Sequence, residues 1–503
     1  MTEPPATVPN AGERAGALGV LAWGAVYLVV AGVLQFGFVS VPWDSDTAYH
    51  AAVGALIREH GLLHAFPWTP FSWLADHYAD KELLFHLLFV PFTGWGWITA
   101  SKVVATLAGG GLLFALYLVL RAERVPLAGV WALAPLVATD VFLFRFSLAR
   151  PHLLSIGLAL AALWAAARGR LFLLALVSAV YPWAYVAWQM PLALVAVAEL
   201  ARWLSGEKPR WWPAVAAASG LALGILLHPN TVNLVRLAWI QIGGVLVENA
   251  WGGREGFELG REFDPFTLAQ WLSWLLGCAA MTAAALPIAW RYRRAAGLPL
   301  AFALAALCFG LATVRTARFA EYFVPFSVAA LALASTSIRW PERVAALAPR
   351  AMPVALLAAL AVYSGSALAE TVRGLGTRQD HVPPALMSWL QGQIPPGSQV
   401  YTCGWERTGE LLLALPDRRF VVALDPSFFH ARDPELYRLW YRLPREAPAD
   451  AVDVIRRRFG ARYVICAWDD RFRAFLNSVG FGAGVRTLGI NDEWSVYDLG
   501  GPP

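Results

Sequence analysis

The residues best suited to chemistry follow the first long apolar run of the chain. Asp44 and Asp46 are separated by one serine, and His50 follows Asp46 by one helical turn. Charged side chains where a helix leaves the membrane are costly and usually functional. A carboxylate there can act as a general base toward an attacking hydroxyl group. Asp46 is therefore the leading catalytic candidate with Asp44 beside it, and helix capping is the alternative role of both.

A second polar group lies later in the same loop, in the sequence ADKELLFH. We expect Glu82 to be a supporting acid, one turn before His86 on a helix. The candidate substrate contacts here are His50, Asp80 and Lys81. Because Mg²⁺ and Mn²⁺ take few carboxylates and keep several waters, such an ion is an open alternative. Its candidate ligands are Asp44, Asp46 and Glu82. A solvated helix start also accounts for these charges.

Arginines form the third candidate group. Arg315 and Arg318 stand three residues apart at the end of an apolar run. Guanidinium groups match phosphate oxygens in a bidentate way, so this pair is a candidate phosphate site. Snorkelling at a helix end is the competing explanation, and it is the one we favour for Arg145.

The elements that must position these residues are membrane helices. The 503-residue chain is 58% hydrophobic and 15% charged, more apolar than one soluble core can hide. We expect about eleven spans. The apolar runs are 17–39, 98–120, 126–143, 151–167, 171–187, 190–204, 212–227, 268–290, 298–313, 322–338 and 351–368. The net charge of +5 is dispersed among short loops, which argues against nucleic acid as a partner.

Basic residues predict the orientation of these spans. Five alternate gaps carry Lys or Arg, and the positive-inside rule assigns them to the cytoplasm. They are 121–124, 168–170, 205–210, 291–294 and 339–343. Residues 1–16 are then a cytoplasmic tail, residues 17–370 the transmembrane domain, and loop 40–97 lies outside. We expect a multi-pass protein of the plasma membrane, with membrane lipids as surroundings.

Two loops should shape the surroundings of the acidic pair. We expect Asp46 to cap a short amphipathic helix that ends at Gly61, with Tyr49, Val53 and Leu56 on one stripe. The segment 228–266 is too long for an ordinary connection and is expected to be a mobile or re-entrant loop over the site.

The composition changes after about residue 370. Strands are expected at 399–405, 419–425, 462–468 and 493–499, alternating with helices. This pattern predicts a soluble α/β domain over 371–503 with a partly parallel sheet, on the outer side. It contains no glycine-rich phosphate loop and no nucleophile elbow. Cys403 and Cys466 fall on strands, and we favour two free buried thiols over a bridge.

Several short motifs resemble the GT-C superfamily of integral membrane glycosyltransferases. The match is best to a bacterial branch with D-x-x-x-H, a glycine, a PFS-like turn and an E-W-L element. Here these elements are Asp46 to His50, Gly54, 70–72, and Glu82 with Leu83 directly after it. The resemblance extends to 317–326 and 409–429. Two departures are the serine between the two aspartates and His228 where Asn is usual.

The resemblance implies a GT-C-like fold. It places the chain beside oligosaccharyltransferases, protein O-mannosyltransferases and aminoarabinose transferases, which the chain resembles distantly. It also implies transfer of a sugar from a polyprenyl-phosphate donor, with Asp46 as the catalytic carboxylate and inversion at the anomeric carbon. The acceptor is a glycan, a lipid or a protein.

Two readings from other classes stay open. A flippase or transporter of a lipid-linked sugar predicts related halves and polar mid-membrane helices, which the sequence does not display. An inactive membrane scaffold predicts no catalytic carboxylates, against Asp46, Asp44 and Glu82.

Overall fold

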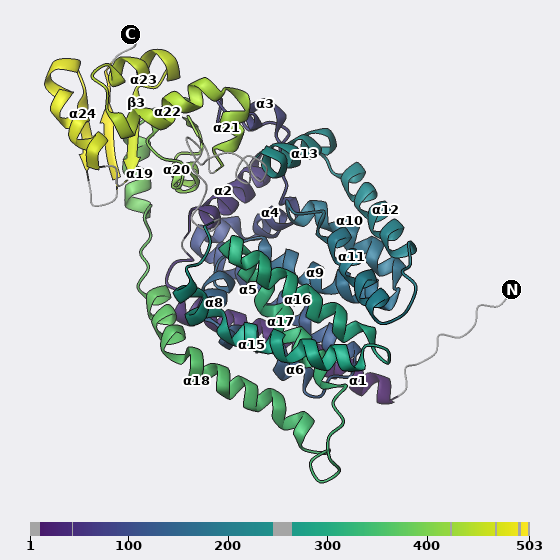
Figure 1. The fold of residues 1–503 in the computed structure, drawn as a ribbon. Helices are drawn as coiled ribbons and strands as arrows, with labels where there is room; N and C mark the ends of the chain where they lie inside the picture. The colour runs from purple at the N-terminus through teal and green to yellow at the C-terminus, as the bar shows by residue number, and fades with distance from the viewer. Residues whose placement is uncertain are drawn as a thin grey trace.

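A bundle of long helices is followed in the chain by a small sheet, which lies at one end of the bundle (Figure 1). The structure is a computed structural model. It describes residues 11–42, 44–244, 264–422, 425–467, 470–490 and 494–500.

Long apolar helices build the bundle, because every backbone polar group in a bilayer must be satisfied within its own segment. They are α1 (Ala11–Val33), α5 (Trp97–Ala122), α9 (His152–Arg168), α10 (Leu171–Ala184), α11 (Met190–Leu204), α12 (Trp212–Leu227), α15 (Leu268–Tyr292), α16 (Gly297–Arg315), α17 (Ala320–Ser335) and α18 (Ala348–Gly376). In the described residues, six helices are long and apolar enough to cross a membrane, or up to seven if a bent pair is one span. The chain is thus a membrane protein, and the predicted count of eleven spans is not confirmed.

The expected span at 126–143 is wrong. It forms three short helices, α6 (Ala128–Trp131), α7 (Pro135–Ala138) and α8 (Asp140–Phe146). Leu127 adopts a left-handed conformation with φ 51°, Pro135 starts α7, and the side chain of Thr139 caps α8. Each of these features ends or begins a helix, so hydrophobicity alone does not give one continuous span here.

The segment after α12 turns sharply. α12 and α13 (Thr231–Ala238) meet at an angle of 120°, and the π-helical turn η3 (Trp239–Gly244) follows. The bend lies at His228 and Pro229, where the proline disfavours a helical conformation of the residue before it. Residues 245–263 of the expected loop, including Glu248 and Trp251, lie outside the described residues.

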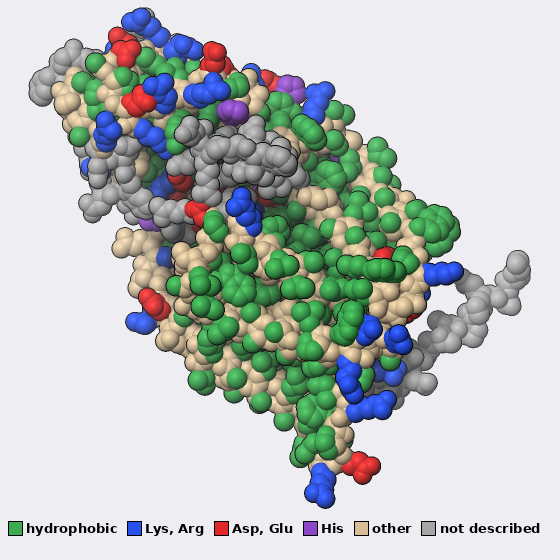
Figure 2. All heavy atoms as spheres, in the orientation of Figure 1, with side chains coloured by type: hydrophobic (Ala, Val, Ile, Leu, Met, Phe, Trp, Pro, Cys, Tyr) green, Lys and Arg blue, Asp and Glu red, His purple; other side chains and the backbone are tan. Residues whose placement is uncertain are grey.

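Four of the basic loops meet at one end of the bundle. Arg168 pairs with Glu123, which joins the loops after α9 and α5. Arg210 donates to the carbonyl of Ala166 at 2.9 Å, and Arg293 donates to that of Leu204 at 3.0 Å. Figure 2 shows apolar side chains over the bundle, with charged side chains gathered at its two ends.

The C-terminal region contains a five-stranded sheet of order β2-β1-β3-β5-β4. Its strands are β1 (Gln399–Thr402), β2 (Arg419–Phe420), β3 (Tyr463–Ala467), β4 (Arg486–Ile490) and β5 (Trp494–Asp498). β1 pairs in parallel with β2 and β3, whereas β5 is antiparallel to both β3 and β4. Strands occur in all four predicted segments, and β4 was missed because it reads as a loop after a helix.

Helices cover this sheet. They are α19 (Pro384–Gln393), α20 (Thr408–Ala414), α21 (Ser427–Arg432), α22 (Pro434–Glu446), α23 (Ala451–Phe459) and α24 (Asp470–Ala483). The buried side of α22 and α23 includes Trp440 and Ile455, which pack with Tyr401 of β1 in one apolar cluster.

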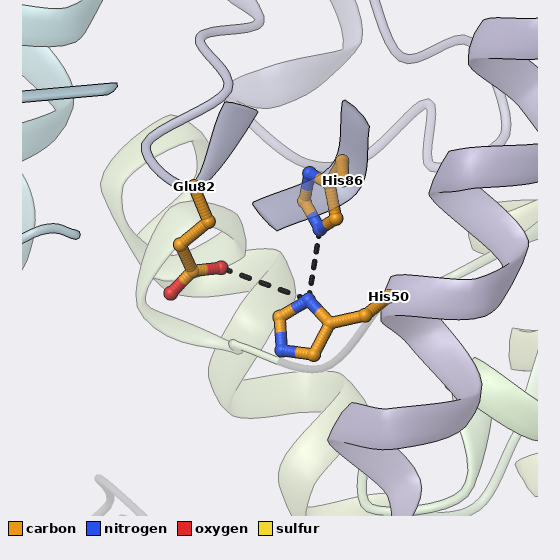
Figure 3. A group of neighbouring side chains, drawn as sticks. All are labelled: His50, Glu82 and His86. Carbon is orange, nitrogen blue, oxygen red and sulfur yellow. Dashed lines mark hydrogen bonds and ion pairs between the residues drawn. The ribbon is translucent and has the colours of Figure 1, made fainter. Parts of the chain in front are cut away.

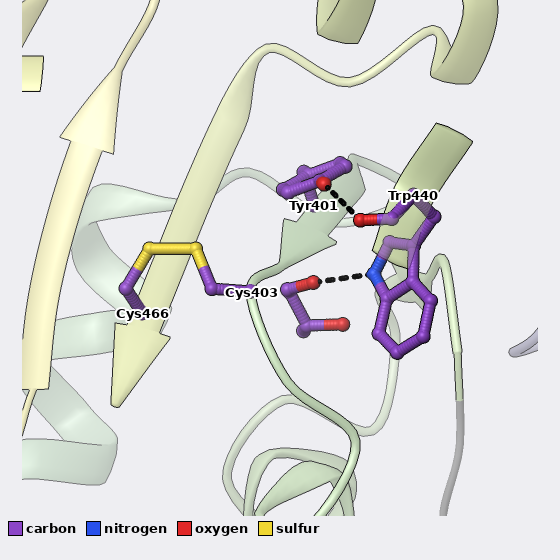
Figure 4. The surroundings of a disulfide bond; sticks show 5 residues. Tyr401, Cys403, Trp440 and Cys466 are labelled. Carbon is purple, nitrogen blue, oxygen red and sulfur yellow. Dashed lines mark hydrogen bonds between the residues drawn. A yellow bond between two sulfur atoms is a disulfide. The ribbon is translucent and has the colours of Figure 1, made fainter. Parts of the chain in front are cut away.

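Cys403 and Cys466 form a disulfide (Figure 4), so the expectation of two free thiols is wrong. Parallel pairing of β1 and β3 brings the carboxyl ends of both strands to the same edge of the sheet, and the two Cα atoms lie 4.9 Å apart. The pairing of two strands that are not consecutive in the chain decides this contact, which spacing along the sequence does not reveal. Cys278 and Cys308, in α15 and α16, are free.

The sheet region docks directly on the loop that carries the acidic residues. Phe420 of β2 donates its backbone N–H to Trp68 at 2.7 Å, and Trp73 donates to Phe428 at 2.9 Å. α20 also packs on α2 (Ser45–His60), where a Cβ on Gly409 would stand 2.4 Å from the carbonyl oxygen of Ser45. Only glycine permits this approach, so the C-terminal region holds the start of α2 in place.

Candidate active site

Helix α2 begins at the acidic pair. Asp44 is its N-cap, and its Oδ1 accepts a hydrogen bond from the backbone N–H of Thr47 at 2.6 Å. The prediction that Asp46 caps the helix is wrong, because Asp46 lies in the first turn. The predicted end at Gly61 is confirmed, with φ 77° at that residue.

Arg150 joins the two carboxylates. Its Nε bonds Asp44 Oδ2, and its Nη1 lies 2.8 Å from Asp46 Oδ2. The Asp44 side chain keeps 14% of its exposure and that of Asp46 keeps 35%. Asp46 is thus the carboxylate that solvent or a substrate can reach. The positive charge between the pair is a guanidinium group, and the sequence did not identify Arg150 as the partner of these aspartates.

A second chain of contacts runs through two buried histidines (Figure 3). His50 Nδ1 lies 2.8 Å from His86 Nε2 and 3.9 Å from Glu82 Oε2. On its other side, His86 Nδ1 lies 2.7 Å from Asp80 Oδ2. His50 and His86 are brought together because α4 (Leu83–Phe89) packs against α2, where Gly54 meets Phe89.

The backbone of Asp80 is hydrogen-bonded to residues in the bend after α12. Its carbonyl oxygen accepts a hydrogen bond from His228 Nε2 at 3.1 Å, and its N–H donates to Asn230 Oδ1 at 3.4 Å. Asn230 Nδ2 also donates to the carbonyl of Leu63 at 3.0 Å. His228, noted in the sequence only as a departure from Asn, therefore supports the site from a distant segment.

Burial sets the proton affinities in this region. Desolvation, followed by the neighbouring His86, Arg150 and Lys81, lowers the pKa of His50 well below its usual value. The imidazole of His50 is therefore neutral at physiological pH. Burial also raises the pKa of Tyr49, with Asp80 and Glu82 adding to the effect. Tyr49 thus stays a protonated hydrogen-bond donor among the carboxylates.

Lys81 points toward the C-terminal region. Its Nζ donates to Gln241 Oε1 at 3.0 Å, and Gln241 Nε2 donates to Asp425 Oδ2 at 2.5 Å. Asp76, which precedes this polar group in the same loop, pairs instead with Arg432 at 2.7 Å on the surface. The structure therefore separates Asp76 from the group formed by Asp80, Glu82 and His86.

The arginines divide into different roles. Arg145 pairs with buried Glu321, so snorkelling is the wrong explanation for it. Arg318 donates to the hydroxyl of Tyr185 at 2.9 Å, and Tyr185 also interacts electrostatically with Glu82. Arg315 is exposed at the end of α16.

His152 connects this basic group with the acidic pair. It is buried at the start of α9, where it interacts electrostatically with Arg145, Arg150 and Arg318. Arg318 and Arg150 thus face one histidine, although they are far apart in the chain. The sequence carried a signal for His152, since it directly follows the Arg-Pro pair of that loop, but none for Glu321 as the partner of Arg145.

The candidate ligands for Mg²⁺ or Mn²⁺ separate into two groups. Asp44 and Asp46 pair with Arg150, whereas Glu82 faces His50. Within the described part of the chain, the three side chains with ligand atoms close enough to share an ion are His50, Glu82 and His86.

Solved structures share this fold, although no family model and no curated protein sequence matches the chain. The oligosaccharyltransferase of Archaeoglobus fulgidus has a TM-score of 0.55 at 13% identity, covering 88% of this chain and 69% of that one. The oligosaccharyltransferase AglB from the same organism, in complex with an inhibitory peptide and a dolichol-phosphate, has a TM-score of 0.53 at 12% identity, with the same coverage.

ArnT from Cupriavidus metallidurans, bound to undecaprenyl phosphate, has a TM-score of 0.55 at 15% identity, covering 96% of this chain and 99% of that one. Both similarities include the bundle and continue into the C-terminal region. The chain therefore shares the fold of these two structures, and the GT-C-like fold that the loop motifs predicted is confirmed.

Proposed function

We propose that this protein is a glycosyltransferase that moves a sugar from a polyprenyl-phosphate-linked donor to an acceptor on the outer face of a bacterial plasma membrane. The observation that carries the proposal is the pairing of Asp46 with Arg150. It leaves one oriented and partly exposed carboxylate beside a buried basic group, in a fold whose solved examples bind undecaprenyl phosphate and dolichol-phosphate.

The proposed reaction is a direct displacement. The acceptor hydroxyl oxygen forms a bond to the anomeric carbon from one side while the bond to the lipid phosphate oxygen breaks on the other. The hydroxyl proton passes to Asp46, and the bonding electrons leave with the phosphate. One displacement inverts the anomeric centre. General bases of this kind contribute roughly 10²–10⁴-fold to the rate.

The supporting residues have distinct proposed roles. Asp44 is occupied by its cap and by Arg150, so it orients the start of α2 rather than taking the proton. Arg318, held by Tyr185, is the proposed contact for the leaving phosphate, with exposed Arg315 nearer the lipid. Fixed cations at that place stabilise the charge that develops on the leaving group. The remaining substrate contacts that we propose are His50, Asp80 and Lys81, with Glu82 as a supporting acid.

Two observations support the outer face. Disulfides persist in oxidising compartments, and the Cys403–Cys466 bridge lies in the region that docks on loop 40–97. The four basic loops meet at the opposite end of the bundle, as expected of a cytoplasmic face. Residues 1–16 are then cytoplasmic, and residues 371–503 form an outer domain that helps to hold a glycan, lipid or protein acceptor.

Asp46→Asn tests the proposal. Purified wild type and variant are incubated with a panel of polyprenyl-phosphate sugars, and sugar transfer or release is followed by mass spectrometry. We expect wild-type turnover to fall by about 10²–10⁴-fold in Asp46→Asn. Asp76→Asn is the matched control, because Asp76 lies on the surface with Arg432, and it should retain activity.

The same assay separates the alternatives. Donor binding without turnover in wild type would contradict the proposal and favour a flippase or a scaffold. Equal turnover in wild type and Asp46→Asn would support the glycosyltransferase assignment but contradict the role of Asp46 as the general base. Arg318→Ala should weaken donor binding, and unchanged affinity would remove Arg318 from the phosphate site.

A further inference from the structure

Three buried side chains from two parts of the outer loop direct ligand atoms at one point. His50 comes from α2, His86 from α4, and Glu82 from the position just before α4 (Figure 3). Their ligand atoms, one from each residue, all lie within 4.8 Å of one another. We propose that His50 Nδ1, His86 Nε2 and Glu82 form a binding site for a divalent transition-metal ion, with zinc as the best fit.

The geometry is close to that of a tetrahedral site. Zinc bonds nitrogen and carboxylate oxygen at about 2.0–2.2 Å, which spaces tetrahedral ligand atoms roughly 3.3–3.6 Å apart. The nitrogens of His50 and His86 lie 2.8 Å apart, and His50 Nδ1 lies 3.9 Å from Glu82 Oε2. Shifts of about half an ångström therefore suffice to bring the two contacts of His50 Nδ1 to the expected spacing.

The second shell fits as well. Asp80 bonds His86 Nδ1 through both carboxylate oxygens, at 2.8 and 2.7 Å. This contact places the imidazole proton on Nδ1 and leaves the Nε2 lone pair directed at the site. Carboxylate, histidine and metal commonly form such a triad. Asp80 also accepts the backbone N–H of Glu82 at 3.1 Å, so one carboxylate orients two of the three proposed ligands.

Proton balance explains how the site can exist without an ion. Because His86 Nε2 is an acceptor, His50 must donate its Nδ1 proton across the 2.8 Å contact. When the ion binds His50 Nδ1, the single N–H proton of this neutral imidazole is carried by Nε2 instead, so metal binding changes the tautomer of His50 and releases no proton from it. The rival state is the hydrogen-bonded histidine pair alone.

The ligand set selects the class of ion. Two imidazole nitrogens and one carboxylate suit zinc and its neighbours, whereas Mg²⁺ prefers oxygen ligands and keeps its waters. His50, His86 and Glu82 are 3%, 1% and 7% exposed, so an ion here would be shielded from competing solvent. The ion would also join α2 to α4 through His50, which lies one helical turn from Asp46. Three protein ligands leave a position for water or a substrate oxygen.

Metal analysis of the full-length protein tests the site directly. Wild type in nanodiscs, purified without chelators, is loaded with Zn²⁺, desalted and measured by mass spectrometry of its metal content. We expect one zinc per chain. His86→Ala and Glu82→Gln should lose it, and Asp80→Asn should weaken affinity by about 10–100-fold. His60→Ala is the matched control, since His60 also lies on α2 but is half-exposed, and it should retain the ion.

X-ray absorption on the zinc-loaded wild type keeps the test independent of variants that fail to fold. Two imidazole nitrogens in a four-coordinate shell are expected. A wild type that retains no zinc, retention that is equal in wild type and His86→Ala, or a shell without imidazole would each overturn the proposal. None of these results depends on sugar transfer, so the metal site and the proposed function can fail separately.

Discussion

Arg150 is the residue that we expect to contribute most to the stability of the acidic pair. Arg150→Gln keeps most of the side-chain length and removes the charge that faces Asp44 and Asp46. Two carboxylates then remain close together, partly desolvated and without their shared cation. The variant should therefore lose stability.

The magnitude follows from exposure. Two unit charges about 4 Å apart attract by about 1 kcal/mol in water and about 4 kcal/mol at the effective dielectric near a protein surface. Arg150 and Asp44 keep 12% and 14% of their side-chain exposure, so their pair lies toward the larger value. Asp46 keeps 35% and is better screened. We expect Arg150→Gln to cost about 2–4 kcal/mol, most of it through Asp44.

Reversible unfolding in mixed micelles measures this loss. The free energy of unfolding is compared for wild type, Arg150→Gln, Asp44→Asn, Asp46→Asn and the two double variants that combine Arg150→Gln with each aspartate change, so that each coupling is isolated. We expect a coupling of about 2 kcal/mol with Asp44 and about 1 kcal/mol with Asp46. Arg168→Gln is the matched control. Arg168 is 46% exposed beside Glu123, and its loss should cost at most about 1 kcal/mol.

A small loss of stability would contradict the proposed role of Arg150. If Arg150→Gln costs no more than Arg168→Gln, the guanidinium group does not stabilise the pair. A coupling below about 0.5 kcal/mol with Asp44 would mean that solvent already screens the contact. Either result would also weaken the assignment of Asp46 as a carboxylate held in one orientation.

Three further outcomes are expected in the C-terminal region. Gly409→Ala should reduce stability by about 1–3 kcal/mol, because the new methyl group forces α20 away from α2. The melting temperature measures this loss. Gly392→Ala is the control and should be neutral, because nothing lies within 4 Å of its new Cβ. Replacing Cys403 and Cys466 by Ser should reduce stability by about 4 kcal/mol, given the 63-residue separation of the two cysteines. Thiol titration of unfolded, unreduced wild type should find two free thiols, and four free thiols would contradict the disulfide. Hydrogen bonds from Arg462, followed by Gly500 N–H and a second arginine, lower the pKa of Asp498, so its contribution is complete at neutral pH and is lost as pH falls through that lowered pKa. Asp498→Asn should thus lower the melting temperature at pH 7 and lose this effect in acid, and an equal loss at both pH values would contradict it.

Much of the molecule was predictable because the signals are local. Apolar runs produced helices in all but one segment, since each needs only enough consecutive apolar residues. Alternation and turn residues predicted four of the five strands. Gly61 ended α2 as expected, because a positive φ is a property of that residue alone. The order of the loop motifs also led to the GT-C fold.

The candidate site was only half predictable. Asp44, Asp46, His50, Asp80 and Glu82 all belong to one loop, and their types alone marked them. The sequence did not say that Asp46 pairs with Arg150, that Arg145 pairs with Glu321, or that His228 supports Asp80. The closure of the Cys403–Cys466 disulfide was also missed.

The sequence by itself thus determined the membrane helices, the alternating C-terminal elements and the loop that carries the acids, because each depends on neighbouring residues. Tertiary structure decided which charges meet. Arg150 reaches Asp44 across 106 residues, and His228 reaches Asp80 across 148. Such pairs form only where packed helices exclude water, so their partners depend on how α2, α9 and the bend after α12 dock together and not on any pattern along the chain.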